Sequence, residues 1–220
     1  MAAPQLALYG HPFSSYSWKA LIALYANGTE FEFRQVPDGE AADYAFVQQA
    51  HPAGKFPILI DGDAQVIEAT AVIEHLALHH PGPAPLIPAD PAEAARMRMI
   101  DRVFDNYVMS SMQLVVDAYI ADRENPDPAQ IERGKAGCRR AYAWLERWLG
   151  HNSLAPHVSL VTCAAAPSLF YADWVEPIPA DAPRVAALRA EILALPAVSR
   201  CVEDARPFRH FFPPGAPERD

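Results

Sequence analysis

Apolar and polar residues alternate along the first part of the chain in a pattern typical of a small mixed sheet. Residues 5–9 and 31–36 alternate with the period of a β-strand, and residues 14–27 between them carry apolar side chains at helical spacing. Gly28 stands where a glycine often ends a helix. This order of strand, helix and strand predicts a parallel β-α-β unit.

A hairpin and a further helix follow. Residues 39–50 are polar and compatible with a helix, and the turn Asp-Gly-Asp at 61–63 separates the apolar runs 56–60 and 65–67. An Asp-Gly pair between two apolar runs is a strong signal for a β-hairpin. Residues 68–80 return to helical spacing, so the sequence predicts a four-stranded mixed sheet with helices on its faces.

The pattern changes at residues 81–91, which contain five prolines and can continue neither a helix nor a central strand. We interpret this stretch as a linker between a domain at 1–80 and a second domain at 92–220. Helical spacing recurs beyond the linker over the stretches 92–122, 128–150, 159–175, 183–195 and 197–205. The second domain is therefore expected to be all-helical, with an irregularly packed tail at 207–220.

The composition is typical of a globular protein, with 51% hydrophobic and 20% charged residues and a net charge of −9. A negative surface repels phosphate backbones, so nucleic acid is not an expected partner. Cys138, Cys163 and Cys201 lack the spacing of a zinc ribbon or a disulfide framework. The eight histidines show no metal-ligand spacing, and we interpret His79 and His80 as the solvated end of a helix, so no metal site is predicted.

Neither a secretion signal nor a membrane span is expected. The start, Met1 to Pro4, has no basic segment followed by an apolar one, and no apolar stretch approaches the roughly 20 residues that span a bilayer. The cytoplasm is therefore the expected location, with no membrane as partner.

The first candidate for chemistry is Pro57, which enters a predicted strand directly after the bulky Phe56. A cis bond at this position would turn the backbone N–H and C=O of Phe56 outward, where they can pair with an extended peptide. The alternative is a trans proline at the start of an edge strand, since only about 5–6% of X–Pro bonds are cis.

The second candidate is the group of serines, Ser14, Ser15 and Ser17, that opens the first helix. A helix N-terminus presents free N–H groups and partial positive charge, which stabilise an anion such as a thiolate. Lowering the pKa of a thiol from about 8.5 by about two units requires roughly 2.7 kcal/mol. A hydroxyl hydrogen bond together with the helix dipole can supply that amount, whereas capping of the helix is the alternative role.

The third candidate is Glu68, which opens the next helix together with Ala69 and Thr70. A carboxylate beside free helix N–H groups can hold an ammonium and a carboxylate together, the pair found at an amino-acid end group. The alternative is that Glu68 only caps the helix or favours its dipole.

Taken together, the sequence resembles the serine-type cytosolic glutathione transferases of bacteria. The resemblance rests on the segments Ser14–Lys19, Lys55–Leu59, Glu68–Ile73 and Ser159–Pro167. These segments occur in the same order as in the family, and the similarity extends over nearly the whole chain. It implies an α/β thioredoxin-like N-terminal domain, an all-α C-terminal helical bundle, glutathione as co-substrate and a homodimer.

The resemblance also implies a glutathione-binding site. The Phe56–Pro57 bond would be cis, and the backbone of Phe56 would pair with the cysteinyl part of glutathione. Lys55 would lie near the glycyl carboxylate. Glu68 and the start of its helix, Ala69 and Thr70, would hold the γ-glutamyl end.

For catalysis, the resemblance implies that Ser14 stabilises the thiolate, which is the nucleophile, with Ser15 and Tyr16 as alternatives. The reaction would be conjugation of glutathione to small hydrophobic electrophiles, a detoxifying activity. The electrophile site is expected between the domains, lined by Phe13, Tyr107, Ser111, Met112 and Tyr171.

Two other functions remain open. One is a glutathione-dependent cis-trans isomerase of a maleyl-type diacid, which would need cations in the pocket; few basic candidates are apparent beyond Arg98 and Arg102. The other is a non-catalytic binding protein with the same fold.

The sequence departs from the family pattern at three positions. Ala69 stands where a serine is usual, so a hydroxyl contact to the γ-glutamyl carboxylate is lost unless Thr70 replaces it. Phe56 replaces the usual valine before the proline. Thr162 replaces the aspartate of a helical capping box, where it can accept a hydrogen bond without charge, so a weaker cap is expected.

Overall fold

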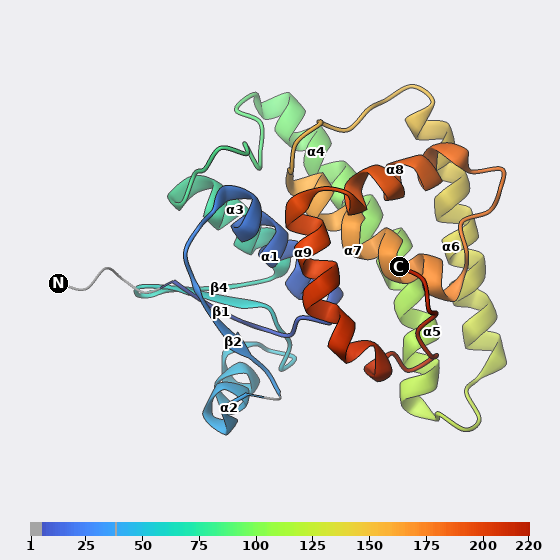
Figure 1. Ribbon diagram of the computed structural model, residues 1–220, viewed down its shortest axis with the longest axis horizontal. Helices are drawn as coiled ribbons and strands as arrows, with labels where there is room; N and C mark the ends of the chain where they lie inside the picture. Colours follow the sequence, from blue (N-terminus) through green and yellow to red (C-terminus); the bar gives the residue numbers. More distant parts are fainter. Residues whose placement is uncertain (1–5, 38) are drawn as a thin grey trace.

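The computed structural model describes residues 6–37 and 39–220. Its first part is a four-stranded sheet in the order β2-β1-β3-β4 (Figure 1). The strands are β1 (Ala7–Gly10), β2 (Glu32–Gln35), β3 (Ile58–Asp61) and β4 (Ala64–Ile67). β1 pairs in parallel with β2 and antiparallel with β3, and β3 and β4 form the predicted hairpin. The first predicted strand, 5–9, begins at Gln5, which lies outside the described residues.

Alternation along β1 divides its side chains between the two faces of the sheet. Three helices accompany the sheet: α1 (Ser15–Asn27), α2 (Ala41–Ala50) and α3 (Ala69–His79). Leu6 and Leu8 join the main core, to which α1 and α3 contribute. Ala7 and Tyr9 join a smaller core with Val47 of α2, which lies on the far side of the sheet from the other helices (Figure 1). Both faces of the sheet are therefore covered.

The rest of the chain is helical. Residues 80–90 form neither helix nor strand. They are followed by α4 (Pro91–Val103), a π-helical segment (Phe104–Met109), α5 (Ser110–Ala121), α6 (Pro128–Leu149), α7 (Leu160–Val175), α8 (Pro183–Leu193), α9 (Pro196–Ala205) and a 3₁₀ segment (Arg206–Phe211). The fold class, a thioredoxin-like part followed by an all-α bundle, is confirmed. Across the described ranges, no helix is both long and apolar enough to cross a membrane.

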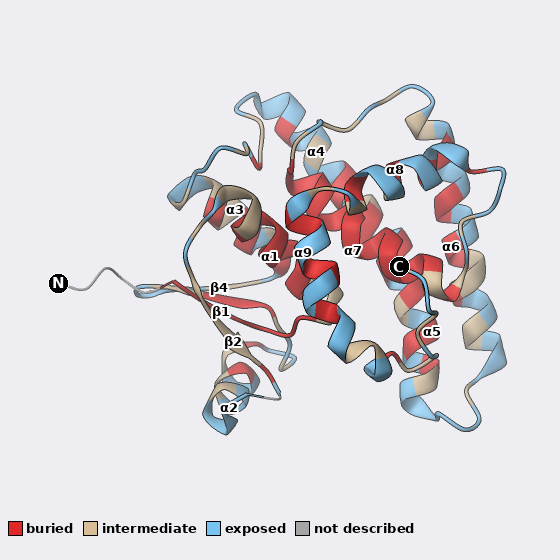
Figure 2. Ribbon diagram, viewed as in Figure 1, coloured by how far each residue is buried: buried red, intermediate tan, exposed pale blue. Residues whose placement is uncertain are grey.

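α7 lies at the centre of the bundle and is buried along almost its whole length (Figure 2). α1 packs against α7 and α9 of the bundle as well as against α3. α1 therefore connects the sheet to the bundle. The weaker capping box expected at α7 is not formed, because neither Ser159 nor Thr162 caps the helix with its side chain. Thr162 instead donates to the carbonyl of His157, and its hydroxyl lies 3.3 Å from Ser159 Oγ.

The helix predicted as one unit over 92–122 is interrupted by the π-helical segment. A π turn contains more residues than an α turn, so the side chains that follow it rotate away from the direction a continuous α-helix would give. Met112 is buried, whereas Tyr107 is 61% exposed and Leu114 is 39% exposed. Helical spacing over 92–122 would place Tyr107 and Leu114 with the buried apolar residues, and this expectation is wrong.

Candidate active site

Two buried aromatic side chains hold the loop that precedes α1. The Trp18 indole N–H donates to the carbonyl of Pro12 at 2.6 Å, and the Tyr171 hydroxyl donates to the carbonyl of Phe13 at 2.8 Å. Trp18 comes from α1 and Tyr171 from α7, so the loop is fixed from both parts of the chain. Ser14 follows as the N-cap residue, with an extended backbone. These contacts determine where α1 begins.

Ser14 caps α1 and also lines a cavity. The backbone N–H of Ser17 donates to Ser14 Oγ at 3.2 Å, so the capping role predicted for this group of serines is confirmed. A hydroxyl that accepts one hydrogen bond still has its own O–H to donate. Capping the helix and donating to an anion in the cavity are therefore compatible. Ser15, the first residue of α1, lines the same cavity.

Tyr16 adds a hydroxyl that stays protonated. Burial raises the pKa of Tyr16 to about 12, and the negative charge of Asp105 contributes to the shift. The phenol is therefore neutral at physiological pH and can donate a hydrogen bond, but it does not act there as a base.

The Phe56–Pro57 peptide bond is cis, as predicted. The pairing of β3 with its neighbours begins at Ile58, so Phe56 lies just before the ladder. Lys55 and Phe56 line the cavity that Ser14 faces. The Val36–Pro37 bond is also cis, and no feature of the sequence predicted it.

Glu68 is the N-cap residue of α3 and has an unusual backbone. Its φ of 71° and ψ of 116° lie in a region that residues with a side chain rarely adopt. Its carboxylate does not cap the helix; it is exposed, with Oε1 3.6 Å from His51 Nε2. His51 Nδ1 accepts the N–H of Ala53, so a neutral His51 carries its proton on Nε2, toward Glu68. Backbone strain of this kind costs about 1–3 kcal/mol and is found preferentially at functional sites.

Ala69 and Thr70 follow Glu68 but face different surroundings. Ala69 is buried and lines a second cavity together with Glu68. The Thr70 hydroxyl donates to Asp101 Oδ2 at 3.1 Å and accepts from Lys19 Nζ at 3.0 Å. The side chain of Thr70 is thus engaged in a buried polar group, and only its backbone remains at the helix start.

The buried polar group centres on Lys19, whose side chain is almost completely inaccessible. Lys19 Nζ lies 2.8 Å from Asp101 Oδ1 and 2.7 Å from Asp105 Oδ2. Arg102, which is half exposed, pairs with both carboxylates. Burial raises the pKa of Asp105 and the nearby Asp101 raises it further, against the opposing charges of Lys19 and Arg102. This group joins α1 and α3 to α4 and the π-helical segment.

Sequence reasoning missed this group. A signal was present: Asp101 and Asp105 are four residues apart in a stretch predicted to be helical, and Lys19 stands inside an apolar helix next to Trp18. A lysine surrounded by apolar residues has to find a buried acid, because an unpaired buried charge is strongly destabilising.

Two cavities adjoin at Tyr16, Lys55 and Phe56. The larger, of about 770 Å³, extends from Ser14 and Ser15 to α5 and to residues 211–213 of the tail. It is lined by the apolar side chains Phe13, Phe56, Met112, Val116, Ile120, Tyr171, Phe211 and Phe212, among others. The smaller, of about 230 Å³, is charged and lies at the start of α3. It is lined by Tyr16, His51, Lys55, Phe56, Pro57, Glu68, Ala69, Arg102, Asp105 and Asn106.

The residues expected to line the apolar cavity are correct in part. Phe13, Met112 and Tyr171 line it, whereas Tyr107 and Ser111 line a separate hollow of about 410 Å³ between α5 and α6. Tyr107 and Ser111 therefore lie outside the apolar cavity and face α6 instead. A π turn changes the direction of the side chains in and after it, which helical spacing alone does not predict. The tail, expected only to pack irregularly, contributes Phe211 and Phe212 to the cavity.

Comparison with known proteins gives consistent matches. Residues 8–84 match the family model described as Glutathione S-transferase, N-terminal domain. Glutathione S-transferase 1 of Dianthus caryophyllus is 26% identical over 171 residues, which cover 75% of this chain and 76% of that protein. A probable maleylacetoacetate isomerase of Vibrio cholerae is 25% identical over 213 residues, which cover 92% of this chain and 97% of that protein.

A solved structure gives the same result for the fold. The crystal structure of a glutathione S-transferase from Methylobacillus flagellatus, determined with GSH bound, has a TM-score of 0.76 to this chain. The match covers 90% of this chain and 98% of that one, at 20% sequence identity. The two proteins therefore share their fold.

Replacement of Lys19 by Met is expected to lower the free energy of unfolding by about 3–5 kcal/mol, because it removes the buried cation and leaves Asp101 and Asp105 with only the half-exposed Arg102 as a partner. Urea unfolding would measure the loss. Arg98→Met is the control, since it breaks an exposed pair with Glu74 and should cost less than about 1 kcal/mol. Equal losses in the two variants would contradict a buried ion group.

Glu68→Gly is expected to be more stable than Glu68→Ala by about 1 kcal/mol. Glycine adopts a positive φ without steric cost, whereas alanine retains the strain of the native backbone. Urea unfolding of the two variants would measure the difference. Because both variants lack the carboxylate, its loss contributes equally to both free energies of unfolding. If alanine were equally or more stable, the strained conformation of Glu68 would be refuted.

Proposed function

The chain belongs to the glutathione S-transferase family, and we propose that it conjugates the thiolate of glutathione to small hydrophobic electrophiles. One observation carries the proposal: a charged cavity and an apolar cavity meet beside the N-terminus of α1. The charged cavity would bind glutathione as co-substrate, and the apolar cavity would receive the electrophile. Proximity of the two reactants then accounts for much of the rate.

The smaller cavity carries charges of both signs, as does the γ-glutamyl end of glutathione. Glu68 and Asp105 suit the ammonium group, and Arg102 suits the carboxylate. Ala69 and Thr70 offer the free backbone N–H groups at the start of α3, which also favour a carboxylate. We propose that the backbone takes the place of the missing serine hydroxyl, because the Thr70 hydroxyl already bonds to Lys19 and Asp101.

The remaining parts of glutathione would extend along the junction of the cavities. The backbone of Phe56 would pair with the cysteinyl residue, beside the cis bond to Pro57, and Lys55 would meet the glycyl carboxylate. The thiol would then lie at the start of α1, within reach of the Ser14 hydroxyl. A hydrogen bond from Ser14 and the helix dipole would stabilise the thiolate by roughly 2–3 kcal/mol.

The larger cavity favours a neutral apolar substrate over a diacid. Of the described residues that line it, Lys55 is the single base and Asp117 the single acid. Arg102 lines only the smaller cavity and is paired with Asp101 and Asp105, while Arg98 pairs with Glu74. If Lys55 binds glutathione, little positive charge is left for a second substrate.

A glutathione-dependent cis-trans isomerase of a maleyl-type diacid is the second candidate. Its support is the likeness to the Vibrio cholerae protein named a probable maleylacetoacetate isomerase, which extends over nearly the whole length of both chains. Such an isomerase would use the same thiolate, so the substrate alone distinguishes the two reactions.

We also propose that residues 1–80 form the glutathione-binding domain, that 81–91 is a linker, and that 92–220 form the domain that shapes the electrophile site. A homodimer is supported by the exposed apolar side chains around the hollow between α5 and α6, Tyr107 and Trp144. The three cysteines are free and buried, which agrees with a detoxifying role in a reducing compartment such as the cytoplasm.

Ser14→Ala is expected to raise the pKa of the bound thiol by about one to two units and to lower kcat/KM at neutral pH roughly 10- to 100-fold. The pH dependence of kcat/KM and the ultraviolet absorbance of the thiolate would measure both effects. Ser14→Asp separates the two roles of the residue, because it restores the helix cap but cannot donate to a thiolate. Ser14→Asp should therefore regain the stability lost in Ser14→Ala but not the activity.

Ser15→Ala and Tyr16→Phe serve as matched controls, since both residues line the same cavity. They should retain most of the activity and an unchanged thiol pKa. A severe loss in either one, with Ser14→Ala remaining active, would transfer the thiol-stabilising role to that residue.

Conjugation and isomerisation can be separated with one preparation of the enzyme. The apolar cavity predicts turnover of glutathione with chlorodinitrobenzene, and a kcat/KM for maleylacetoacetate at least about tenfold lower than for this electrophile. Retention on immobilised glutathione measures binding independently of turnover. Faster isomerisation would favour the second candidate, and binding without either reaction would indicate a non-catalytic binding protein.

A further inference from the structure

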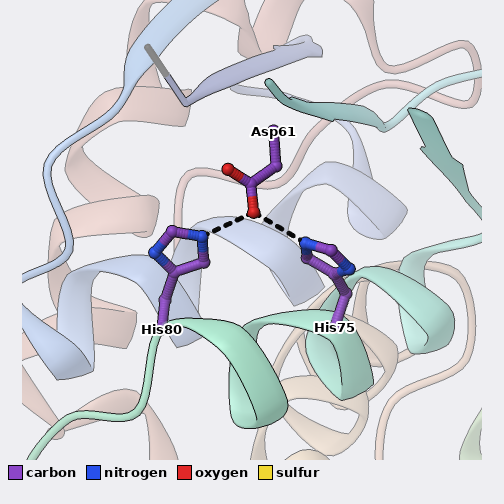
Figure 3. Close-up of side chains that lie close together, drawn as sticks. All are labelled: Asp61, His75 and His80. Atoms are coloured by element: carbon purple, nitrogen blue, oxygen red, sulfur yellow. Dashed lines mark hydrogen bonds and ion pairs between the residues drawn. The ribbon is translucent and has the colours of Figure 1, made fainter. Parts of the chain in front are cut away.

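At the end of α3 farthest from Glu68, three side chains converge on one point (Figure 3). Asp61 is the last residue of β3, His75 lies within α3, and His80 is the C-cap residue of α3. The Nε2 atoms of His75 and His80 lie 2.8 Å and 2.7 Å from the same oxygen, Oδ2 of Asp61. Within residues 6–37 and 39–220, no other three histidine, cysteine or acidic side chains are grouped so that they could hold a metal ion.

We propose that Asp61, His75 and His80 form a binding site for a divalent transition-metal ion, with Zn²⁺ as the best match. Two imidazole nitrogens and one carboxylate oxygen are a ligand set that zinc uses, with water in the fourth position. Magnesium and calcium prefer ligand sets made of oxygen alone. The inference is independent of the proposed glutathione chemistry.

The geometry requires only a small adjustment. The three ligand atoms lie within 4.8 Å of one another. Tetrahedral zinc with bonds of about 2.0–2.1 Å needs ligand atoms about 3.3 Å apart. Each imidazole would therefore retreat from Asp61 by about half an ångström, and the two Nε2 atoms, which lie within 4.8 Å of each other, would come to the same separation. His80 can move in this way, because its backbone has left the helix, with φ −131° and ψ 55°, and its side chain is 30% exposed.

Binding of a metal requires a change of tautomer at both histidines. Each imidazole now directs Nε2 at Asp61 Oδ2, so that Nε2 carries the ring proton and donates it to the carboxylate. Each histidine would bind the ion through Nε2 as the neutral tautomer, with its ring proton on Nδ1.

The site lies apart from the cavities described above. Asp61, His75 and His80 line neither of the two cavities. Along α3, His75 lies about 10 Å and His80 about 18 Å from Glu68, at 1.5 Å per residue. A bound ion would connect the end of β3 to the end of α3 and would stabilise this contact without taking part in the reaction.

The linear sequence did not reveal this group. Two histidines that share a face of a helix stand three or four residues apart, which would pair His75 with His79. His79 is instead exposed, as expected of a solvated helix end, and its ring lies at a tilt of 40° to that of His75, with the ring centroids 4.4 Å apart. His80 reaches Asp61 because it follows the last turn of the helix, so the expectation that His80 is merely solvated is wrong.

Titration with Zn²⁺ alone, using untagged full-length protein pretreated with a chelator, tests the proposal. Calorimetry in the presence of a competing chelator should give one ion per chain, and Zn²⁺ should raise the midpoint of thermal unfolding. His75→Gln and His80→Gln should each weaken binding at least about tenfold. His79→Gln is the matched control, since it removes a neighbouring imidazole that is not a proposed ligand. Its zinc affinity should stay within about twofold of that of the wild type. Cys138, Cys163 and Cys201 are buried and do not compete for the ion.

Circular dichroism would establish that each variant is folded. If His75→Gln does not fold, the zinc affinities of His80→Gln and Asp61→Asn test the proposal instead. His80→Gln is expected to fold, because His80 lies at a partly exposed helix end. Absence of a saturable site, or equal zinc affinity in the wild type and in His80→Gln, would overturn the proposal. The three side chains would then form only a hydrogen-bonded contact between β3 and α3.

Discussion

One buried ammonium group, that of Lys19, fixes the arrangement of the whole cleft. It is enclosed between the carboxylates of Asp101 and Asp105 at 2.8 Å and 2.7 Å, and almost none of it is accessible to water. A charge in this position requires its partners to stay in place, because unpairing it is costly. α1 therefore cannot move relative to α4 and the π-helical segment. Since Ser14 begins α1 and Asp105 lines the smaller cavity, both walls of the cleft depend on this contact.

The cleft has a charged part and an apolar part. Its charged part lies at the start of α3, where Glu68 adopts a strained backbone and Ala69 follows in the helix. Its apolar part is assembled from α1, α5, α7 and the tail, and Tyr171 both lines it and holds the carbonyl of Phe13. The start of α1 lies where the two parts meet. In the proposed reaction, the polar tripeptide and the apolar electrophile would thus meet at Ser14 while each remains in its own part of the cleft.

Much of this arrangement could be predicted from local sequence. The Asp-Gly turn at 61–63 correctly predicted the hairpin, and the serines correctly predicted the start of α1, because turn residues and helix caps act on neighbours a few positions away. The cis bond before Pro57 could be predicted only from the resemblance to a family, since most X–Pro bonds are trans. The position of Tyr107 could not be predicted, because a 3.6-residue period contains no information about a π turn.

The sequence by itself determined the order of the strands and helices, apart from the π-helical interruption, and placed Ser14 and Glu68 at helix starts, because periodicity and capping are properties of short segments. Only the tertiary structure decided the partners of Lys19, the contribution of Phe212 to the apolar cavity and the pairing of Asp61 with two histidines. These contacts join residues that are far apart along the chain or lie beyond a helix end. They form because buried charges and polar atoms must find partners once the core has closed, and no local spacing specifies which partners those are.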